Sequence, residues 1–149
     1  MTIAAILAGR TQAIVHCSPG TSVGDAARLL AERRIGALPV LEGADGPVTG
    51  IFSERDLLYC LAEHGVAVLD RPVSDVMTAP VISVHREISV LQALALMTER
   101  RIRHLPVLHA SDGETPRLIA FLSIGDLVKY RLEKMEREAQ DLRDYITSA

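Results

Sequence analysis

Apolar residues in this chain recur with two spacings, one typical of helices and the other of short strands. Positions 23–30 and 90–97 carry apolar residues at the i, i+3, i+4, i+7 spacing that lines one face of a helix. A serine stands just before each run, at Ser22 and Ser89, with an acidic or amide residue three positions later. The pattern therefore predicts two amphipathic helices that begin at matched serine caps.

Short β-type runs surround these two helices. One run precedes each helix, and two runs follow it, separated by a loop rich in Gly, Asp and Pro, which predicts a hairpin. Each hairpin ends in Ser-x-x-Asp, where a second helix is expected to begin. The expected strands are 13–17, 38–41 and 48–52 in the first half, and 81–84, 105–108 and 118–122 in the second.

The two halves of the chain are copies of one unit. When the sequence is shifted by 67 positions, 12 of the 20 residues at 22–41 are identical to those at 89–108. The unit reads β-α-β-β-α, and one such unit is too small to bury its sheet alone. We therefore expect a mixed α/β (α+β) fold in which two repeats pack about a pseudo-twofold axis. The predicted boundaries are 1–62 for the first repeat, 63–72 for a linker, 73–131 for the second repeat and 128–149 for a C-terminal helical extension.

The last apolar pattern is a seam close to the C-terminus. Its residues are spaced 4-3-4-3-4 and predict a helix from Ile124 to about Tyr145. An isolated helix of this length is marginal in water, so the seam either crosses a partner subunit or lies back on its own repeat. We favour a contact between two copies, because symmetric dimers are the commonest oligomers. The seam comprises Val128, Leu132, Met135, Ala139, Leu142 and Ile146.

Composition narrows the class of protein. Of 149 residues, 48% are hydrophobic and 3% aromatic, so the core must be aliphatic and few rings are offered for stacking on bases. The net charge of −3 also argues against nucleic acid as a partner. No apolar run reaches the ~18–20 residues that cross a bilayer, and the start lacks the basic region of a signal peptide. We expect a cytoplasmic protein without a membrane partner, with Cys17 and Cys60 as buried thiols.

The order of the motifs in each half of the chain resembles that of the CBS domain, and the two halves together resemble a CBS pair. The resemblance rests on the Leu-Pro-Val strand, the Ser-x-x-Asp step and the Val-Ser-Asp-Val-Met-Thr segment at 73–78, and it covers residues 3–131. The chain is most similar to small stand-alone bacterial CBS-pair proteins, which implies a role in signal transduction. The resemblance also implies that an adenosine-containing ligand binds in the cleft between repeats: AMP, ADP, ATP, NAD(H) or S-adenosylmethionine. No required cofactor is implied.

Two aspartates are the expected ribose ligands when the family pattern is carried over by position. They are Asp56 and Asp126, and a carboxylate can accept hydrogen bonds from both ribose hydroxyls. Ser53 and Ser123 lie one turn earlier and would bond sugar or phosphate. An alternative without a ligand is that each serine only caps the second helix, with the aspartate favoured by the helix dipole.

The repeats differ at positions where the family binds phosphates. Arg103 and His104 precede Leu-Pro in the second repeat, whereas a Gly-Ala pair stands there in the first. Together with Arg55, these two residues are expected to form one positive cluster between two unequal sites. The alternative is that the arginines are solvated surface charges. Thr78 is expected to contact base or ribose, or else to be an ordinary turn residue.

No catalytic signature accompanies these residues. The sequence lacks the glycine motifs of dinucleotide and phosphate binding, the nucleophile elbow, and metal-ligand spacing among its five histidines. We therefore predict a non-enzymatic adenine-nucleotide sensor without a metal, acting as a homodimer on an unidentified regulated protein. The alternative is a structural dimerisation or docking module whose nucleotide sites are vestigial.

Overall fold

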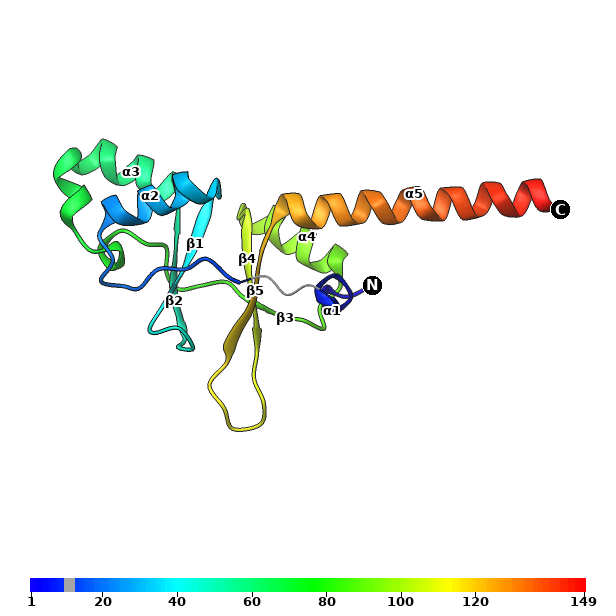
Figure 1. The fold of residues 1–149 in the computed structure, drawn as a ribbon, viewed down its shortest axis with the longest axis horizontal. Coiled ribbons are helices and arrows are strands. Elements are labelled where there is room, and N and C mark those ends of the chain that lie inside the picture. The colour runs from blue at the N-terminus through cyan, green and yellow to red at the C-terminus, as the bar shows by residue number, and fades with distance from the viewer. Residues whose placement is uncertain (10–12) are drawn as a thin grey trace.

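The computed structural model describes residues 1–9 and 13–149, and it has two similar units side by side (Figure 1). The predicted mixed fold is confirmed. The helices are α1 (Ile3–Leu7), α2 (Val23–Arg33), α3 (Glu54–His64), α4 (Val90–Arg100) and α5 (Ile124–Ser148), with short 3-10 helices η1 (Val66–Asp70) and η2 (Val73–Asp75). The strands are β1 (Ala37–Leu41), β2 (Val48–Ser53), β3 (Val84–His85), β4 (His104–His109) and β5 (Arg117–Ser123).

Serine caps begin the four longer helices. In α2 the Ser22 hydroxyl accepts a hydrogen bond from the Asp25 N–H at 3.1 Å. Ser89 forms a reciprocal capping box at the start of α4, and Ser53 and Ser123 do the same for α3 and α5. These bonds satisfy N–H groups that have no partner within the helix. The predicted helix starts and the caps predicted at Ser22 and Ser89 are confirmed. Ser53 and Ser123 cap their helices as well.

Each unit contains the predicted antiparallel hairpin, β1 with β2 and β4 with β5. The strand expected before each first helix is much shorter than predicted. Only Val84–His85 pairs with β4, and Cys17 makes a single bridge to Val40. The prediction of strands over 13–17 and 81–84 is therefore wrong for most of their length. In the first unit the physical reason is that residues 13–15 line a cavity between the units instead of joining a sheet.

Each unit has an aliphatic core of its own, and the chain crosses between the units to complete both cores. Ile3 and Ile6 lie at the start of the predicted first repeat, yet they are buried in the core of the second. Conversely, Val73 opens the second repeat and is buried in the first core. Val68, from the predicted linker, is buried there as well. The segment leading into each repeat therefore packs against the other repeat and ties the two into one body.

Both cysteines are buried thiols, as predicted. Within the described residues neither takes part in a disulfide. Burial raises the pKa of Cys17 to about 11, because a thiolate would lose its hydration there. Two protonated, covered thiols act as small core side chains rather than as reactive groups.

The C-terminal helix α5 projects away from the body of the protein (Figure 1). It ends at Ser148, three residues beyond the predicted end at Tyr145. Leu127 is fully buried, whereas the seam is exposed, from 42% at Val128 to 64% at Ile146. The seam therefore does not lie back on its own repeat, which was one of the two alternatives. No helix in the described part of the chain is both long and apolar enough to cross a membrane.

Candidate functional site

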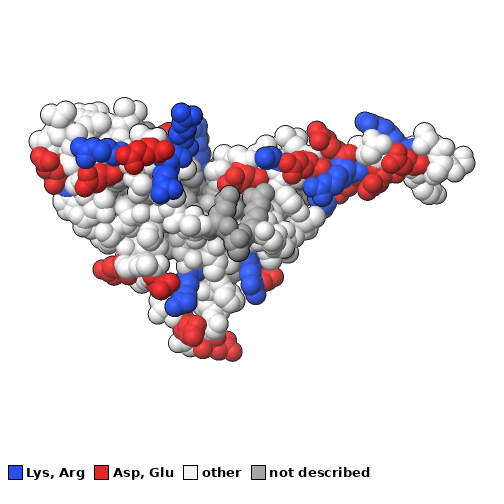
Figure 2. Space-filling view, viewed as in Figure 1, with Lys and Arg blue, Asp and Glu red and all other residues white. Residues whose placement is uncertain are grey.

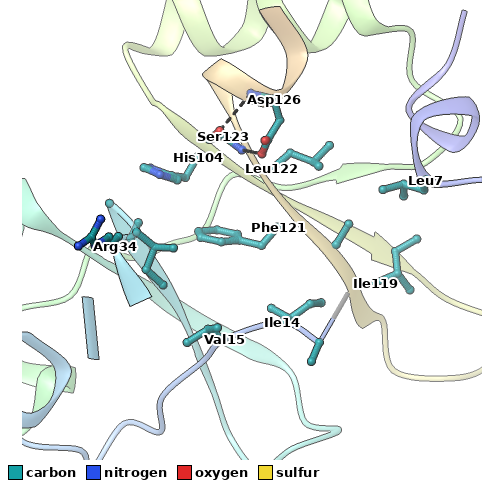
Figure 3. A pocket seen from close by; sticks show the side chains of 15 residues that line it. Leu7, Ile14, Val15, Arg34, His104, Ile119, Phe121, Leu122, Ser123 and Asp126 are labelled. Atoms are coloured by element: carbon teal, nitrogen blue, oxygen red, sulfur yellow. Dashed lines mark hydrogen bonds between the residues drawn. The ribbon is translucent and has the colours of Figure 1, made fainter. Parts of the chain in front are cut away.

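A cavity of about 440 Å³ lies between the two units (Figure 3). Its volume is in the range of small-molecule sites. One wall comes from residues 13–15 and from the turn between α2 and β1, and the other comes from β5 and the start of α5. The lining residues are Leu7, Ala13, Ile14, Val15, Arg34, Ile35, Gly36, Ala37, His104, Ile119, Ala120, Phe121, Leu122, Ser123 and Asp126.

Asp126 reaches the cavity from the first turn of α5 (Figure 3). Its Oδ2 accepts from the Ser123 N–H at 2.8 Å, and the Ser123 Oγ accepts from the Asp126 N–H at 3.1 Å. Capping therefore uses one carboxylate oxygen, and no residue in the described part of the chain donates a hydrogen bond to Oδ1. The positive end of the α5 dipole interacts favourably with an acidic side chain at this position. Such a carboxylate is ready to accept hydrogen bonds from ligand hydroxyls.

His104 lies where the two units meet. Its ring stacks on Phe121, with centroids 5.5 Å apart and planes at 17°. A Cβ built on Gly36 would stand 3.2 Å from His104 Cε1, so a larger residue at 36 would press on the ring. Burial lowers the pKa of His104, and the carboxylates of Glu54 and Asp126 partly oppose that shift. The ring is therefore held mainly neutral at pH 7, and an anion placed beside it would favour its protonation.

Arg34 is a basic residue of the cavity that the sequence reasoning missed. It caps the C-terminus of α2 in the left-handed conformation, with φ 53°, and its counterpart Arg101 ends α4 with φ 54°. From the sequence, an arginine at a helix end needs no role beyond complementing the helix dipole. The left-handed turn redirects the chain into β1 and leaves Arg34 on the cavity wall formed by the first unit (Figure 3). The signal that could have identified it is the matched pair of arginines before both Leu-Pro strands.

The other predicted ribose ligand, Asp56, already has hydrogen-bond partners within the chain. Its Oδ2 accepts from the Ser53 N–H at 2.9 Å and from the Ser53 hydroxyl at 3.0 Å. Its Oδ1 accepts from the Thr78 hydroxyl at 2.8 Å. Thr78 is held there by two backbone hydrogen bonds with Ile51, at 2.8 and 3.0 Å. The structure thus brings together three predicted ligand residues, none of which lines the 440 Å³ cavity.

The predicted positive cluster is only partly assembled at the cavity. Of Arg55, Arg103 and His104, only His104 is among the lining residues. Arg103 is exposed, and its charge lies close enough to lower the pKa of His104 further. Arg55 is exposed on α3. Arg103 corresponds to Gly36 of the first repeat. Gly36 lines the cavity beside Asp126 of the second repeat, so the repeat relation assigns Arg103 to the side of the molecule that carries Asp56.

The cavity offers three kinds of contact in one place. An acidic residue comes from the second unit, a basic residue comes from the first, and aliphatic and aromatic residues complete the lining. Such a site suits a ligand with hydroxyls, an anionic group and a flat apolar part. Within residues 1–9 and 13–149, no three His, Cys, Asp or Glu side chains are grouped so that they could hold a metal ion.

Known proteins show the same division into two repeats. The CBS domain family matches residues 10–63 and 73–133. A CBS-domain containing protein from Agrobacterium tumefaciens has a crystal structure that is similar to this chain with a TM-score of 0.77 and 37% identity, over 87% of this chain and 92% of that one. The Arabidopsis thaliana protein "CBS domain-containing protein CBSX3, mitochondrial" is 35% identical over 87% of this chain. The chain spans 62% of the length of that plant protein. The crystal structure of CBSX2 in complex with AMP is 31% identical, with a TM-score of 0.69, over 82% of this chain and 90% of that one.

Proposed function

The chain belongs to the CBS-domain family with two domains in tandem, and we propose that it is a non-enzymatic regulatory module that binds an adenine nucleotide beside Asp126. The observation that carries the proposal is the cavity of about 440 Å³ between the repeats, with a carboxylate on one wall and a guanidinium on the other. The AMP complex of CBSX2, at 31% identity, supports this class of ligand. The module acts as a homodimer and passes the signal to a regulated protein.

Each part of the nucleotide has a counterpart in the cavity. The ribose hydroxyls donate to Asp126 Oδ1, the oxygen that capping does not use. The adenine lies on the apolar walls, among them Ile14 and Phe121. The phosphate lies near Arg34, whose planar fork matches phosphate oxygens, and near His104, which donates once protonated.

The Asp56 side is a second and weaker site in this proposal. A ribose there has to displace the Thr78 hydroxyl, which donates to Asp56 Oδ1 at 2.8 Å. The exchange of one hydrogen bond for another leaves little net gain. Arg55 and Arg103 are then the candidates for phosphate contacts on that side, and the first nucleotide binds beside Asp126.

Binding transmits a signal because the cavity has one wall from each repeat. A ligand that contacts both walls stabilises one relative arrangement of the repeats at the expense of others. The crossed segments, with Ile3 in the second core and Val73 in the first, connect that arrangement to both cores. A partner protein reads the arrangement that the nucleotide favours.

A second candidate function is a structural docking module with vestigial nucleotide sites. The observation that favours it is the Asp56 side, where the capping box and Thr78 account for every oxygen of the carboxylate. On this alternative Asp126 is also only a capping residue. The two candidate functions make opposite predictions about whether added nucleotide stabilises the protein.

Thermal unfolding with added ligand separates the two. Protein stripped of ligand is heated with AMP, ADP, ATP, NAD⁺, NADH or S-adenosylmethionine, with GMP as the control for the base. A ligand at ~100 times its dissociation constant adds about 2.7 kcal/mol to stability, which shifts the midpoint by several degrees. We expect a shift with at least one adenine ligand and a stoichiometry of one high-affinity site per chain by calorimetry. The absence of any shift at millimolar ligand would support the docking module instead.

A further inference from the structure

The exposed seam of α5 is an interaction surface, and the charges beside it identify the partner. We propose that the seam binds the same seam of a second copy of this chain, with the two helices parallel and in register. The seam consists of Val128, Leu132, Met135, Ala139, Leu142 and Ile146, and its five larger side chains are 42–64% exposed. The inference rests on the homodimer of the proposed function and gives its geometry, but it does not require a bound nucleotide.

The seam lies on a different face of α5 from Leu127 and Tyr130, which pack on the protein. Leu127 is fully buried against the core of the second unit, and Tyr130 packs against the same core. Val128 follows Leu127 directly and is therefore turned by about 100° around the helix axis. Lys134, on the Leu127 side, lies by Met1. A partner helix can thus lie along the seam without displacing Leu127 or Tyr130. Glu138, beside the seam, already pairs with Lys134 of its own helix at 3.5 Å and would share that contact with a partner residue.

The order of charges beside the seam distinguishes between parallel and antiparallel pairing. Leu132, Ala139 and Ile146 take the a positions of the heptad, and the other seam residues take the d positions. The flanking e positions are then Lys129, Glu136 and Arg143, and the flanking g positions are Arg131, Glu138 and Tyr145. Figure 2 shows acidic and basic side chains interspersed along α5. Because basic and acidic residues alternate along each flank, the relative direction of the two helices decides whether like or opposite charges face each other.

Parallel pairing brings opposite charges together. In a parallel dimer, each g residue faces the e residue five positions later on the other helix. Arg131 then faces the partner's Glu136, and Glu138 faces the partner's Arg143. The twofold axis repeats both contacts, so four ion pairs flank the seam. Ile146 at an a position and Leu142 at a d position are also the residue types that favour two strands.

Antiparallel pairing of the whole seam brings like charges together. Residues at e then face e, and residues at g face g, so that Glu136 and Glu138 each lie near their own copies in the partner. Lys129 lies near the partner's Arg143 in the same arrangement. Sliding the antiparallel helices by one heptad removes the repulsion but leaves two apolar residues at one end of the seam outside the contact. Only the parallel arrangement covers the full seam and satisfies its charges.

Disulfide cross-linking of the full chain tests the orientation. In Ile146→Cys, parallel pairing places the two new thiols next to each other, and we expect a disulfide-linked dimer under mild oxidation. Full antiparallel pairing would place position 146 opposite 128, and the two thiols about 27 Å apart. The matched control is Asp144→Cys, on the opposite face of the same helix, for which we expect only monomer on a non-reducing gel. Cys17 and Cys60 are buried and do not compete.

A charge swap tests the ion pairs by sedimentation equilibrium. Glu138→Arg or Arg143→Glu alone turns two attractive pairs into repulsive ones, and we expect each to weaken the dimer about tenfold. The double variant Glu138→Arg/Arg143→Glu restores opposite charges, and we expect it to recover the dimer.

The proposal is overturned if the chain is monomeric, if Ile146→Cys does not cross-link, or if the double variant dimerises no better than the single ones. Nucleotide binding is measured on the same variants by thermal shift. If the α5 contact is wrong, binding by the wild-type chain is unaffected. If the nucleotide proposal is wrong, no variant binds nucleotide, whatever its oligomeric state.

Discussion

The pair Asp126→Asn and Asp56→Asn tests the nucleotide site against a control that the chain itself provides. Both aspartates stand at the third position of a helix and cap it through Oδ2, at 2.8 and 2.9 Å from the N–H of the preceding serine. Asparagine has nearly the same shape, and its oxygen can keep that capping bond. The two substitutions therefore have similar effects on helix capping and differ mainly in what the second carboxylate oxygen contacts.

The expected magnitude follows from that second oxygen. In Asp126→Asn, the amide group replaces Oδ1 at the cavity, and an NH₂ group cannot accept a hydrogen bond from a ribose hydroxyl. Loss of a hydrogen bond to a charged acceptor costs about 1.5–3 kcal/mol, which corresponds to a roughly ten- to hundredfold weaker affinity. In Asp56→Asn, the bond lost is the internal one from Thr78, and we expect the first nucleotide to bind with an affinity within about threefold of wild type.

Isothermal titration calorimetry of both variants with AMP, at one salt concentration, gives the two affinities. The unfolding temperature of each variant without ligand serves as the check on folding. The reasoning is refuted if Asp126→Asn binds AMP as tightly as wild type while folded. An equal loss of AMP affinity in both variants would contradict the prediction that nucleotide binds more strongly beside Asp126 than beside Asp56.

The remaining predictions concern charge, pH and packing. Arg34→Ala should weaken AMP binding about tenfold and leave adenosine binding unchanged, with Arg101→Ala as the control; an equal loss for adenosine would exclude a phosphate contact. Because burial lowers the pKa of His104 in the folded state, its contribution to stability is complete above about pH 6.5 and is lost as the pH falls through the folded pKa. Urea unfolding from pH 7 to 5 should therefore show a smaller loss of stability in His104→Gln than in wild type, and parallel curves would contradict this. Leu127→Ala should cost about 2–5 kcal/mol and its exposed neighbour Val128→Ala less than about 0.5 kcal/mol, measured by urea unfolding at a protein concentration where the chain is monomeric; similar costs would mean that the burial of Leu127 is not what stabilises the start of α5.

Several features of the fold could be predicted from the sequence, because they depend on residues close together in the chain. A helix start needs only a serine and its neighbour three positions on, as at Ser53 and Ser123, and both were predicted correctly. The seam of α5 is likewise a periodic pattern within one helix. The duplication was visible because the two copies still share residues at matched positions.

The candidate site was less accessible to sequence reasoning, because it is made of segments far apart in the chain. Asp126 lines the cavity together with Ile14, although most of the chain separates the two residues in sequence. Arg34 joins them only because its left-handed turn faces the other unit. Asp56 matches Asp126 in the sequence, yet Thr78 from the other repeat gives it a different environment.

The sequence by itself determined the repeat, the helices, the hairpins and the chemistry available at each helix start, since those follow from local periodicity and capping. Only the tertiary structure decided that Ile3 of the first repeat is buried in the second core and that Val73 of the second repeat is buried in the first. It also decided that residues 13–15 form a cavity wall rather than a strand. The physical reason is that burial and hydrogen bonding depend on which surfaces meet when the repeats pack. Two matched Ser-x-x-Asp motifs therefore differ in the structure: Asp126 has one oxygen that capping does not use, whereas both oxygens of Asp56 accept hydrogen bonds.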